Sequence, residues 1–509
     1  MKLSRITKIS ILLASFFALD KVLGIVRQAL TTRLFGGFTS ELDAYNAANN
    51  IPDMLVVLLS IGGLAVALIP ALSEAMTKSG RPAMWEMFCK IANLAFVLTA
   101  GLALLVVIFA VPLVKNVIAP GFTPEKQLLT AQLMRMYLLA TLLFTMSGLV
   151  TAGLQANQHF FLPALAPLLY NIGQIFGVLV LAPKVGMQIG PVLLPAFGLG
   201  IYGLTYGAVI GAAFHLLIQV PGLIKYKFRW TPRISVTDPE VVKVLKLIGP
   251  RLVTVWFIQM VFIARDNLAS RLGEGPVSAL TYGYMLQQVP ETLIGTALGV
   301  ALLPTLAELA AKNEREELRA TLERVVKVLL ALTLPIAAVL SVGLGPLTAR
   351  VFGLDVANNT LLMWATRGFM VGLAGHSLKE VAARSFYAQQ RVIPPVFTAL
   401  MTLVIFWTSG WFLMNWLGAP GIGLADSLAF TIEAVVLLVL MSRGFSRPVK
   451  INSTLLRGVL AAAAGAGAAY LVLNFLPGGQ LVIGLASLTA GALAAVPFII
   501  PEIKLLVRL

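Results

Sequence analysis

Apolar runs of eighteen or more residues recur from one end of this 509-residue chain to the other. Each run is long enough for one helix to cross about 30 Å of hydrocarbon. Hydrophobic residues make up 58% of the chain and charged residues only 12%, with a mean hydropathy of +0.90. The first run continues past Gly24, so it is too long for a signal peptide and is expected to stay as the first span. The sequence therefore predicts an all-α polytopic membrane protein.

The apolar runs and the segments between them predict about fourteen transmembrane helices and their orientation. The expected spans lie near residues 7–35, 43–72, 84–113, 127–152, 160–182, 198–223, 248–270, 277–307, 328–349, 359–378, 392–415, 421–442, 458–475 and 481–502. Of the 38 lysines and arginines, 26 fall in termini and connecting segments on one side of the membrane and six on the other. Under the positive-inside rule, this asymmetry places both termini in the cytoplasm. The single cysteine, Cys89, is then expected at the cytoplasmic end of the third span.

The net charge of +16 is explained mostly by this topology, with an added attraction to anionic membrane lipids. It therefore does not indicate a nucleic-acid partner. One cysteine cannot form an intramolecular disulfide or a cysteine cluster for metal, and the three histidines are scattered along the sequence. The sequence contains no Walker phosphate loop and no catalytic pattern of Ser, His and Asp or of paired carboxylates. We expect neither an enzyme nor a resident metal or cofactor.

The remaining six cations fall inside the predicted spans, where a cation at a helix centre costs at least ~2.5–3.5 kcal/mol. They are Lys21, Arg27, Arg135, Arg251, Arg265 and Arg367. Arg135, Arg251 and Arg367 lie near predicted helix ends, from which a long side chain can reach the lipid headgroups. Lys21 and Arg27 lie deeper, so their position asks for a different explanation.

A polar stripe follows one face of the first predicted helix. Asp20, Gly24, Arg27 and Thr31 follow one another at helical spacing, with Lys21 beside them. Lipid cannot solvate such a stripe, which indicates that it faces a helix-bundle interior or a water-filled cavity. Because a guanidinium donates two hydrogen bonds at once to phosphate, the stripe favours an anionic, phosphate-containing ligand.

The second predicted span carries a similar polar face. Asp43, Asn46, Asn50 and Asp53 lie three or four residues apart. These side chains could bind a ligand with the first helix. They could equally bridge neighbouring helices, since amides often hold membrane helices together.

An internal repeat relates the two halves of the chain. Residues 27–55 align without a gap to residues 265–293, at an offset of 238, with nine identities that include Arg27/Arg265 and Pro52/Pro290. The repeat predicts two six-helix lobes related by a parallel pseudo-two-fold axis along the membrane normal. The expected divisions are an N-lobe at 1–223, a cytoplasmic linker at 224–246, a C-lobe at 247–445 and a C-terminal helix pair at 446–509. Small residues in that pair would allow close helix packing or a groove for an acyl chain.

The chain also resembles a known family through motifs that follow one another along almost its whole length. They include "VLGIVRQALTTRLFG" and "LDAYNAANNIPDML" in the first two spans, "PALAPLLYNIG" at 163–173, "GTALGVALLPTLAE" at 295–308 and "RSFYAQQR" at 384–391. In these segments, and in its fourteen expected spans, the chain is similar to the MurJ (MviN) family of lipid II flippases in the MOP exporter superfamily.

The resemblance implies two six-helix lobes around a cationic cavity, with an extra helix pair that forms a lipid-facing groove. It implies alternating-access transfer of a polyprenyl-pyrophosphate-linked cell-wall precursor, lipid II, from the inner to the outer leaflet for peptidoglycan biosynthesis. The expected location is the bacterial cytoplasmic (inner) membrane. The expected partners are this lipid-linked oligosaccharide, membrane lipids and proteins of cell-wall synthesis or division. The resemblance also implies coupling to the membrane potential or to a monovalent cation.

The family's first-helix cations correspond to Lys21, which is usually Arg, and to Arg27. Its acidic residue early in the second helix corresponds to Asp43. With the polar face of span 2 and the repeat, the candidate substrate-binding residues are Lys21, Arg27, Asp43, Asn46, Asn50, Arg265 and Gln287. The candidate charge-balancing carboxylates are Asp20, Asp53 and Asp266.

Three positions depart from the family pattern. Val56, Val57 and Met285 stand where the family usually has arginines. A less cationic cavity would suit a less charged headgroup, so another lipid-linked oligosaccharide, such as an exopolysaccharide or O-antigen unit, stays an alternative cargo. More distant alternatives are a drug or cation antiporter of the same superfamily and a non-transporting scaffold for cell-wall enzymes.

Overall fold

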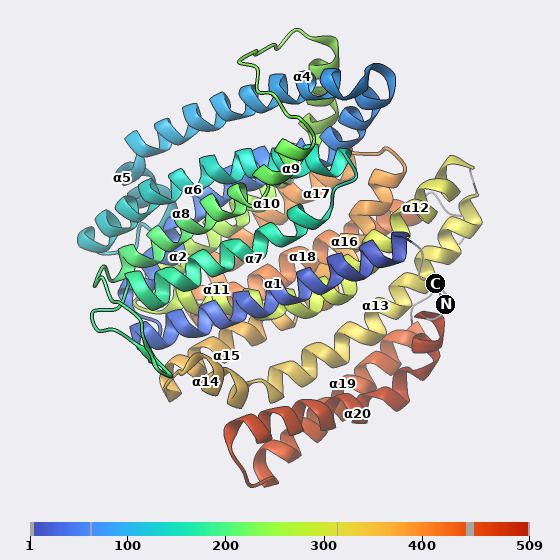
Figure 1. Cartoon of the computed structure of the whole chain (residues 1–509). Coiled ribbons are helices and arrows are strands. Elements are labelled where there is room, and N and C mark those ends of the chain that lie inside the picture. The colour runs from blue at the N-terminus through green and yellow to red at the C-terminus, as the bar shows by residue number, and fades with distance from the viewer. Residues whose placement is uncertain (1–4, 62–63, 313, 444–451, 507–509) are drawn as a thin grey trace. The chain divides into compact units, whose positions relative to one another are not determined.

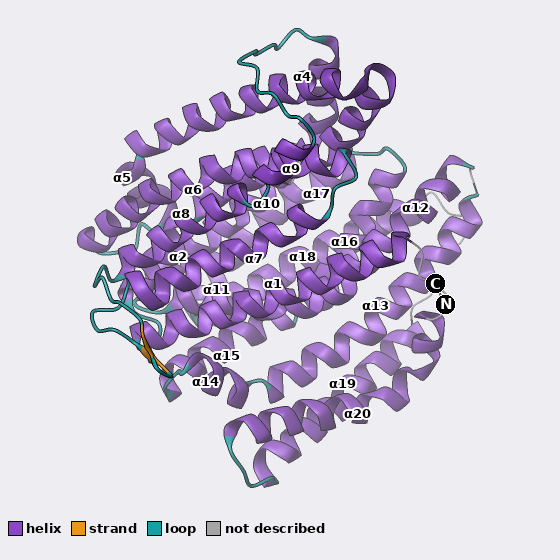
Figure 2. Cartoon of the chain, in the orientation of Figure 1, coloured by secondary structure: helices purple, strands orange, loops and turns teal. Residues whose placement is uncertain are grey.

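The computed structural model describes residues 5–61, 64–312, 314–443 and 452–506, and nearly all of them are helical (Figures 1 and 2). The exception among regular elements is one short antiparallel hairpin, in which Gln188 lies opposite Leu193 and Ile189 opposite Val192. The chain forms two compact units, Met1–Gln259 and Met260–Leu509. The division falls inside one helix, α10 (Pro239–Ala269), just beyond the predicted linker at 224–246.

The first unit contains the helices up to the first part of α10. Its elements are α1 (Arg5–Phe35), α2 (Ser40–Ala48), α3 (Asn50–Val56), η1 (Val57–Ile61), α4 (Leu64–Ile108), α5 (Ala110–Leu113), η2 (Val114–Ile118), α6 (Pro124–Ala156), α7 (Phe161–Phe176), η3 (Gly177–Leu181), β1 (Gln188–Ile189), β2 (Val192–Leu193), α8 (Ile201–Leu217) and α9 (Val220–Lys225).

The second unit begins in the last third of α10. Its further elements are η4 (Ser270–Leu272), α11 (Pro276–Glu291), η5 (Thr292–Thr296), α12 (Ala297–Ala311), α13 (Arg315–Gly343), α14 (Gly345–Phe352), α15 (Val356–Met370), α16 (Leu373–Ala388), α17 (Ile393–Leu417), α18 (Ala419–Ser442), α19 (Asn452–Phe475) and α20 (Gln480–Leu506). Here η4 is a 3₁₀ turn, whereas η1, η2, η3 and η5 are π-helical turns.

Side-chain caps begin three of these helices where the sequence changes from loop to helix. The Thr39 hydroxyl accepts from the Leu42 amide at the start of α2, and Thr123 does the same for Lys126 at the start of α6. Asp355 caps α15 by accepting from the Asn358 amide at 2.8 Å. Each cap satisfies one of the amides that a helix start leaves without an internal partner.

Eleven helices in the described ranges are long and apolar enough to cross a membrane. The first, second and tenth expected spans are not among them. The first is the 31-residue α1, which carries the charges of Asp20, Lys21 and Arg27. The second is divided into α2, α3 and η1, and the tenth is divided between α15 and α16. The expectation of a polytopic helical protein is confirmed, while the count of fourteen stays a prediction.

Two expected connecting segments are helical. The predicted loop at 379–391 belongs largely to α16, and residues 315–327 form the beginning of α13. Hydropathy predicted too short a length for both helices, because part of each helix carries charged side chains that resemble a loop. Lys379, Glu380 and Arg384 therefore belong to a packed helix and not to a free cytoplasmic loop.

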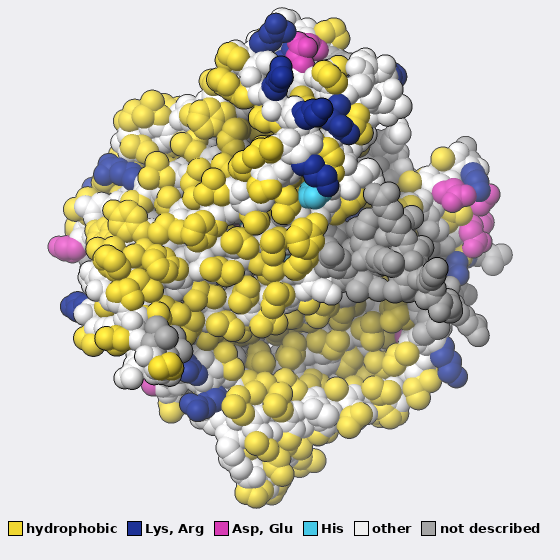
Figure 3. All heavy atoms as spheres, in the orientation of Figure 1, with side chains coloured by type: hydrophobic (Ala, Val, Ile, Leu, Met, Phe, Trp, Pro, Cys, Tyr) yellow, Lys and Arg dark blue, Asp and Glu magenta, His cyan; other side chains and the backbone are white. Residues whose placement is uncertain are grey.

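The long helix α4 bends sharply at Gly80, which has φ 83° and ψ 175°. A residue with a side chain would be strained at this φ, so glycine permits the bend. The bend is visible near the label α4 in Figure 1. In Figure 3, hydrophobic side chains dominate the visible sides of the helices, and Lys and Arg gather around this bend and the loop before α10. The membrane orientation stays a prediction from the charge asymmetry.

In the second unit, α18 packs against α15, α16 and α17, whereas α13, α19 and α20 pack together (Figure 1). Glycines allow α16 to approach α18 closely. A Cβ atom added to Gly372 would lie 2.5 Å from the Cα of Ser427, and one added to Gly375 would lie 2.7 Å from the Cα of Thr431. Small residues give membrane helices this kind of close contact.

Cys89 cannot report the orientation directly, because its side chain is fully buried and its Sγ atom lies 3.7 Å from the Arg229 carbonyl oxygen. We therefore predict the labelling of exposed positions in a Cys89→Ala background. Ser79→Cys should react with a membrane-impermeant maleimide only after permeabilisation, and Val185→Cys should react in intact cells. The measurement is gel-shift labelling with a thiol-reactive polyethylene glycol. The reverse pattern would overturn the orientation.

Candidate functional site

Arg27 lies half-buried on α1 within a wall of tyrosines from three other helices. Its charge interacts electrostatically with Tyr45 of α2, Tyr137 of α6 and Tyr170 of α7. The Tyr45 and Tyr137 rings lie 5.6 Å apart, and the Tyr170 hydroxyl accepts from Gln174 Nε2 at 2.8 Å. Within the described part of the chain, the Arg27 guanidinium makes no hydrogen bond or ion pair. Its donors therefore stay available to a ligand.

Asp20 connects this stripe of α1 to α7. Its carboxylate accepts from Asn171 Nδ2 at 2.8 Å and interacts electrostatically with both Lys21 and Arg27. Lys21 is exposed, and within the described residues its ammonium group makes no hydrogen bond or ion pair. The charge-balancing role of Asp20 stays a prediction.

Asp43 was predicted to bind substrate, which requires an accessible carboxylate, but its side chain is inaccessible. Its carboxylate is fully buried and lies 3.1 Å from Lys126 Nζ, whose side chain is 8% exposed. The Lys126 ammonium group also lies 3.9 Å from the centre of the Phe122 ring. Lys126 lies just before the fourth expected span, 127–152, but it belongs to the first turn of α6. Because this pair holds α2 to α6 away from solvent, Asp43 is better explained as a structural residue than as a ligand.

The other polar residues of the second expected span are more accessible. Asn46 and Asn50 are half-buried, and Asn50 Nδ2 donates to the Ala47 carbonyl at 3.3 Å. Asp53 is exposed and interacts electrostatically with Tyr170. Asp53 therefore belongs to the same polar wall as Arg27. Val56, one of the departures from the family pattern, is buried and cannot contribute a polar contact there.

Arg265 is held by its own unit. Its Nε atom donates to Asp266 Oδ1 at 3.0 Å, and its Nη2 atom donates to Thr281 at 3.4 Å. Its guanidinium also lies 5.9 Å from the centre of the Tyr284 ring, and only 7% of the residue is exposed. Arg265 thus differs from Arg27, its counterpart in the sequence repeat, in having its charge already neutralised by Asp266.

Gln287 is also buried, at 1% exposure, and its Nε2 atom has no hydrogen-bond acceptor among the described residues. It belongs to α11, in the second unit, as do Arg265 and Asp266 at the end of α10. Apart from the buried Asp43, the candidate residues therefore divide into a more accessible set on α1, α2 and α3 and a buried set on α10 and α11.

Two further intramembrane arginines bind backbone carbonyls of neighbouring helices. Arg135 Nε donates to the Val107 carbonyl at 3.1 Å, and Arg367 Nε donates to the Ser341 carbonyl at 2.9 Å. Arg367 also lies over the Trp364 ring. These contacts explain both residues without a ligand, although their positions near helix ends predicted side chains that reach the lipid headgroups.

Sequence reasoning missed the tyrosines around Arg27 and a second group of charges, which lies on α11, α16 and α18. Tyr170 and Asn171 belong to the family motif "PALAPLLYNIG", which marks them as candidates. Nothing in the motif predicts that they lie beside α1. Among the described residues, no group of three or more His, Cys, Asp or Glu side chains is placed to hold a metal ion.

We predict that Asp43→Asn lowers stability strongly, because it leaves the Lys126 charge buried without its partner. Loss of one partner of a buried ion pair costs about 3–5 kcal/mol. The measurement is the thermal unfolding midpoint in detergent, with Asp43→Asn/Lys126→Met as the control that removes both charges and should recover most of the loss. If Asp43→Asn unfolds like the parent but loses transport, Asp43 acts on the substrate after all.

Comparison with known proteins agrees with this fold. A family model described as lipid II flippase MurJ matches residues 32–489. The lipid II flippase MurJ of Burkholderia cenocepacia is 28% identical over 447 residues, which cover 86% of this chain and 84% of that protein. The probable lipid II flippase MurJ of Bdellovibrio bacteriovorus is 27% identical over 479 residues, which cover 91% and 87%.

Solved structures give the same answer for the fold. A lipid II flippase MurJ in an inward closed conformation superposes with a TM-score of 0.79 at 21% identity, covering 97% of this chain and all of that one. An inward-facing multidrug-resistance MATE transporter of the MOP superfamily gives 0.68 at 14% identity, covering 87% and 95%. The resemblance expected from the sequence motifs is confirmed. Because the family model matches most of its length, the chain belongs to the lipid II flippase MurJ family.

Proposed function

We propose that this protein moves lipid II from the inner to the outer leaflet of the bacterial cytoplasmic membrane, and that Arg27 binds its pyrophosphate. The environment of Arg27 supports this residue assignment. Arg27 is half-buried and interacts electrostatically with Tyr45, Tyr137 and Tyr170. Its guanidinium makes no hydrogen bond within the described residues. A guanidinium fork matches phosphate oxygens geometrically. A cation at this depth whose hydrogen-bond donors are unused is costly unless a ligand or water meets them.

Lys21 would supply a second cation for the diphosphate. Asn46 and Asn50 offer amides, and the tyrosines offer hydroxyls, that can hydrogen-bond a sugar headgroup. Asp20, which interacts with both cations, would offset their charge between cycles. Binding of this kind must be reversible, because the same contacts have to release the headgroup on the outer side.

The architecture proposed for this activity is fourteen transmembrane helices. They form two six-helix lobes in a parallel repeat and a C-terminal helix pair, with both termini cytoplasmic. Family membership and the eleven apolar helices support it. Alternating access would expose the Arg27 wall first to the cytoplasm and then to the outer side, while the polyprenyl tail stays in lipid. Membrane lipids would surround the protein, and proteins of cell-wall synthesis or division would be its partners.

An alternative cargo follows from the departures at Val56, Val57 and Met285, none of which can contact phosphate as arginine does. A lipid-linked exopolysaccharide or O-antigen unit would be the substrate in that case. Depletion of the protein in its native host separates the two: accumulation of lipid II supports the first cargo, and accumulation of another polyprenyl-linked glycan supports the second.

We predict that Arg27→Ala abolishes flipping while the protein stays folded and inserted, because the substitution removes the guanidinium that would donate two hydrogen bonds to the pyrophosphate. Arg27→Lys should keep the charge but only part of the activity, and Lys21→Arg should be tolerated because it preserves a cation. The measurement is transfer of lipid II in reconstituted vesicles, scored by its accessibility to an enzyme added outside.

Arg135→Lys is the matched control. It makes the same substitution in the same unit, at an arginine that donates to the Val107 carbonyl, and flipping should stay close to that of the parent. Full activity of Arg27→Ala at normal protein level would remove Arg27 from the mechanism. It would leave the stripe on α1 explained by contacts between helices.

A further inference from the structure

A cavity of about 710 Å³ opens at one end of the second unit. It lies where α12 and α16 end, where α13 begins and where α18 reaches Met441. The charge asymmetry of the sequence predicts that this end of the unit faces the cytoplasm. The volume falls within the range of about 300–1,000 Å³ that is typical of small-molecule sites. The role proposed for Arg27, in the first unit, makes no use of this cavity.

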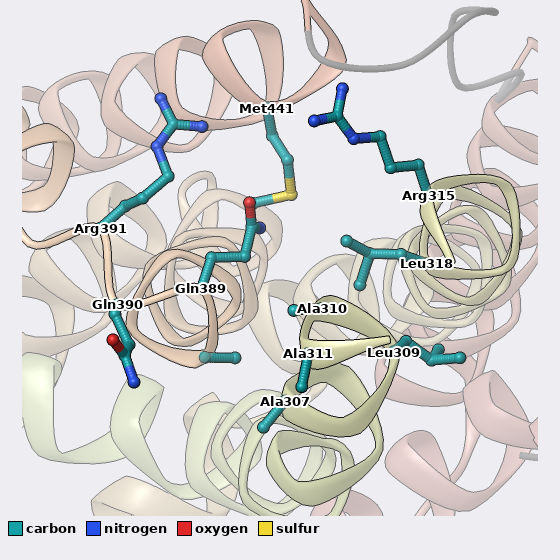
Figure 4. Close-up of a pocket in the computed structure, with 11 residues that line it drawn as sticks. Ala307, Leu309, Ala310, Ala311, Arg315, Leu318, Gln389, Gln390, Arg391 and Met441 are labelled. Atoms are coloured by element: carbon teal, nitrogen blue, oxygen red, sulfur yellow. The ribbon is translucent and has the colours of Figure 1, made fainter. Parts of the chain in front are cut away.

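Two arginines line the cavity from opposite sides, with Met441 between them (Figure 4). Arg315 is the first residue of α13, and Arg391 lies three residues beyond the end of α16. Within the described residues, neither guanidinium makes a hydrogen bond or an ion pair. The Arg391 guanidinium lies 5.2 Å from the centre of the buried Phe386 ring, a contact that leaves its N–H groups without an acceptor. Both guanidiniums can therefore donate to a ligand.

The backbone after α16 turns back to bring Arg391 to the cavity. Gln390 has φ 57°, in the left-handed region that residues other than glycine rarely adopt. The Arg391 amide donates to the Phe386 carbonyl at 2.9 Å, which closes the turn over the end of the helix. Glycine at position 390 would relieve the strain. It would also remove a side-chain amide that lines the cavity.

No carboxylate balances the two guanidiniums in the cavity wall, because the described residues that line it include neither Asp nor Glu. The carboxylates of the four surrounding helices are engaged with other side chains. Their contacts are Glu308 with Lys312, Glu316 and Glu323 with Arg319, Glu317 with Arg324, Glu380 with Arg384, Asp426 with His376, and Glu433 with Thr398 and Thr402. Glu314, next to Arg315 in the sequence, interacts electrostatically with Lys312.

Most of the remaining wall is apolar. It consists mainly of Ala307, Ala310 and Ala311 of α12, Leu318 of α13 and Met441 of α18. Such a wall can cover the carbon part of a ligand while a few polar groups fix its orientation. The side-chain amides of Gln389 and Gln390 add donors and acceptors for hydroxyl or phosphate oxygens.

We propose that this cavity binds a phosphate ester, with Arg315 and Arg391 holding the phosphate from two sides. A guanidinium matches phosphate oxygens geometrically and stays charged. Cations on opposite sides suit a tetrahedral anion, which presents oxygen atoms in several directions, better than a planar carboxylate. A soluble phosphate ester of the cytoplasm and the headgroup of an anionic phospholipid both offer this chemistry.

A bound phosphate would connect the beginning of α13 to the turn after α16. It would thus hold together two helix ends of the second unit whose own charges do not attract each other. Binding at this site is expected in the absence of lipid II. The proposal therefore does not rest on the flippase function or on Arg27.

The test measures how fast N-ethylmaleimide modifies a cysteine in the cavity wall. Ala311→Cys in a Cys89→Ala background places a thiol at an exposed lining position, where a bound ligand should cover it. The full-length protein in detergent is titrated with inorganic pyrophosphate at constant ionic strength. At about ten times the half-maximal concentration, modification should slow about tenfold, because roughly one site in ten is then empty.

A second arm tests the lipid source. The same protein is placed in vesicles of phosphatidylcholine, with or without added phosphatidylglycerol, and the modification rates are compared. Slowing by pyrophosphate alone supports a soluble ester, slowing by phosphatidylglycerol alone supports a lipid headgroup, and slowing by both supports the shared phosphate chemistry. Unchanged modification in both arms would overturn the proposal.

Arg315→Gln/Arg391→Gln should abolish the slowing, since glutamine keeps hydrogen-bond donors but not the charge. Both arginines are exposed, so the fold should be kept, and an unchanged modification rate without ligand checks this. Arg229→Gln/Lys246→Gln is the charge-matched control: it removes two exposed cations of the first unit, and the slowing should be retained. Slowing that persists in Arg315→Gln/Arg391→Gln would contradict the assignment of these arginines.

Discussion

The cost of placing a charge in hydrocarbon governs this structure. Every intramembrane charge needs a partner, a backbone carbonyl, water or a ligand, because lipid offers none of these. Arg135 and Arg367 satisfy the requirement with carbonyls of neighbouring helices, and Asp43 satisfies it with Lys126. The residues that do not satisfy it within the described chain, above all Arg27, are those in which a function is to be sought.

Arg27 and Arg265, which correspond in the sequence repeat, lie in opposite electrostatic environments. Arg27 lies among tyrosine hydroxyls with its donors unused, whereas Arg265 is neutralised by the carboxylate of the next residue and buried. In the proposed mechanism, substrate recognition would therefore rest mainly on the first unit. The second unit carries the larger group of buried titratable side chains, around His376 and Asp426.

Close helix contacts make the second arrangement possible. Without side chains at Gly372 and Gly375, α16 lies near enough to α18 for the imidazole to reach the Asp426 carboxylate. The same contacts exclude water and raise the cost of any unbalanced charge. Packing and electrostatics are thus coupled, because the glycines bring the charged groups of α16 and α18 together in the buried interior.

Local chemistry in the sequence determined the membrane helices, their charge asymmetry and the polar face of α1 that carries Arg27, because apolar length and helical periodicity are properties of neighbouring residues. The helical extent of α16 escaped prediction, since charged residues in its second half resemble a loop by hydropathy. Only the tertiary structure decided the partners. Asp43 pairs with a lysine 83 positions away, and His376 pairs with an aspartate 50 positions away. No periodicity within one helix encodes such pairs, because they depend on which helix faces overlap after packing.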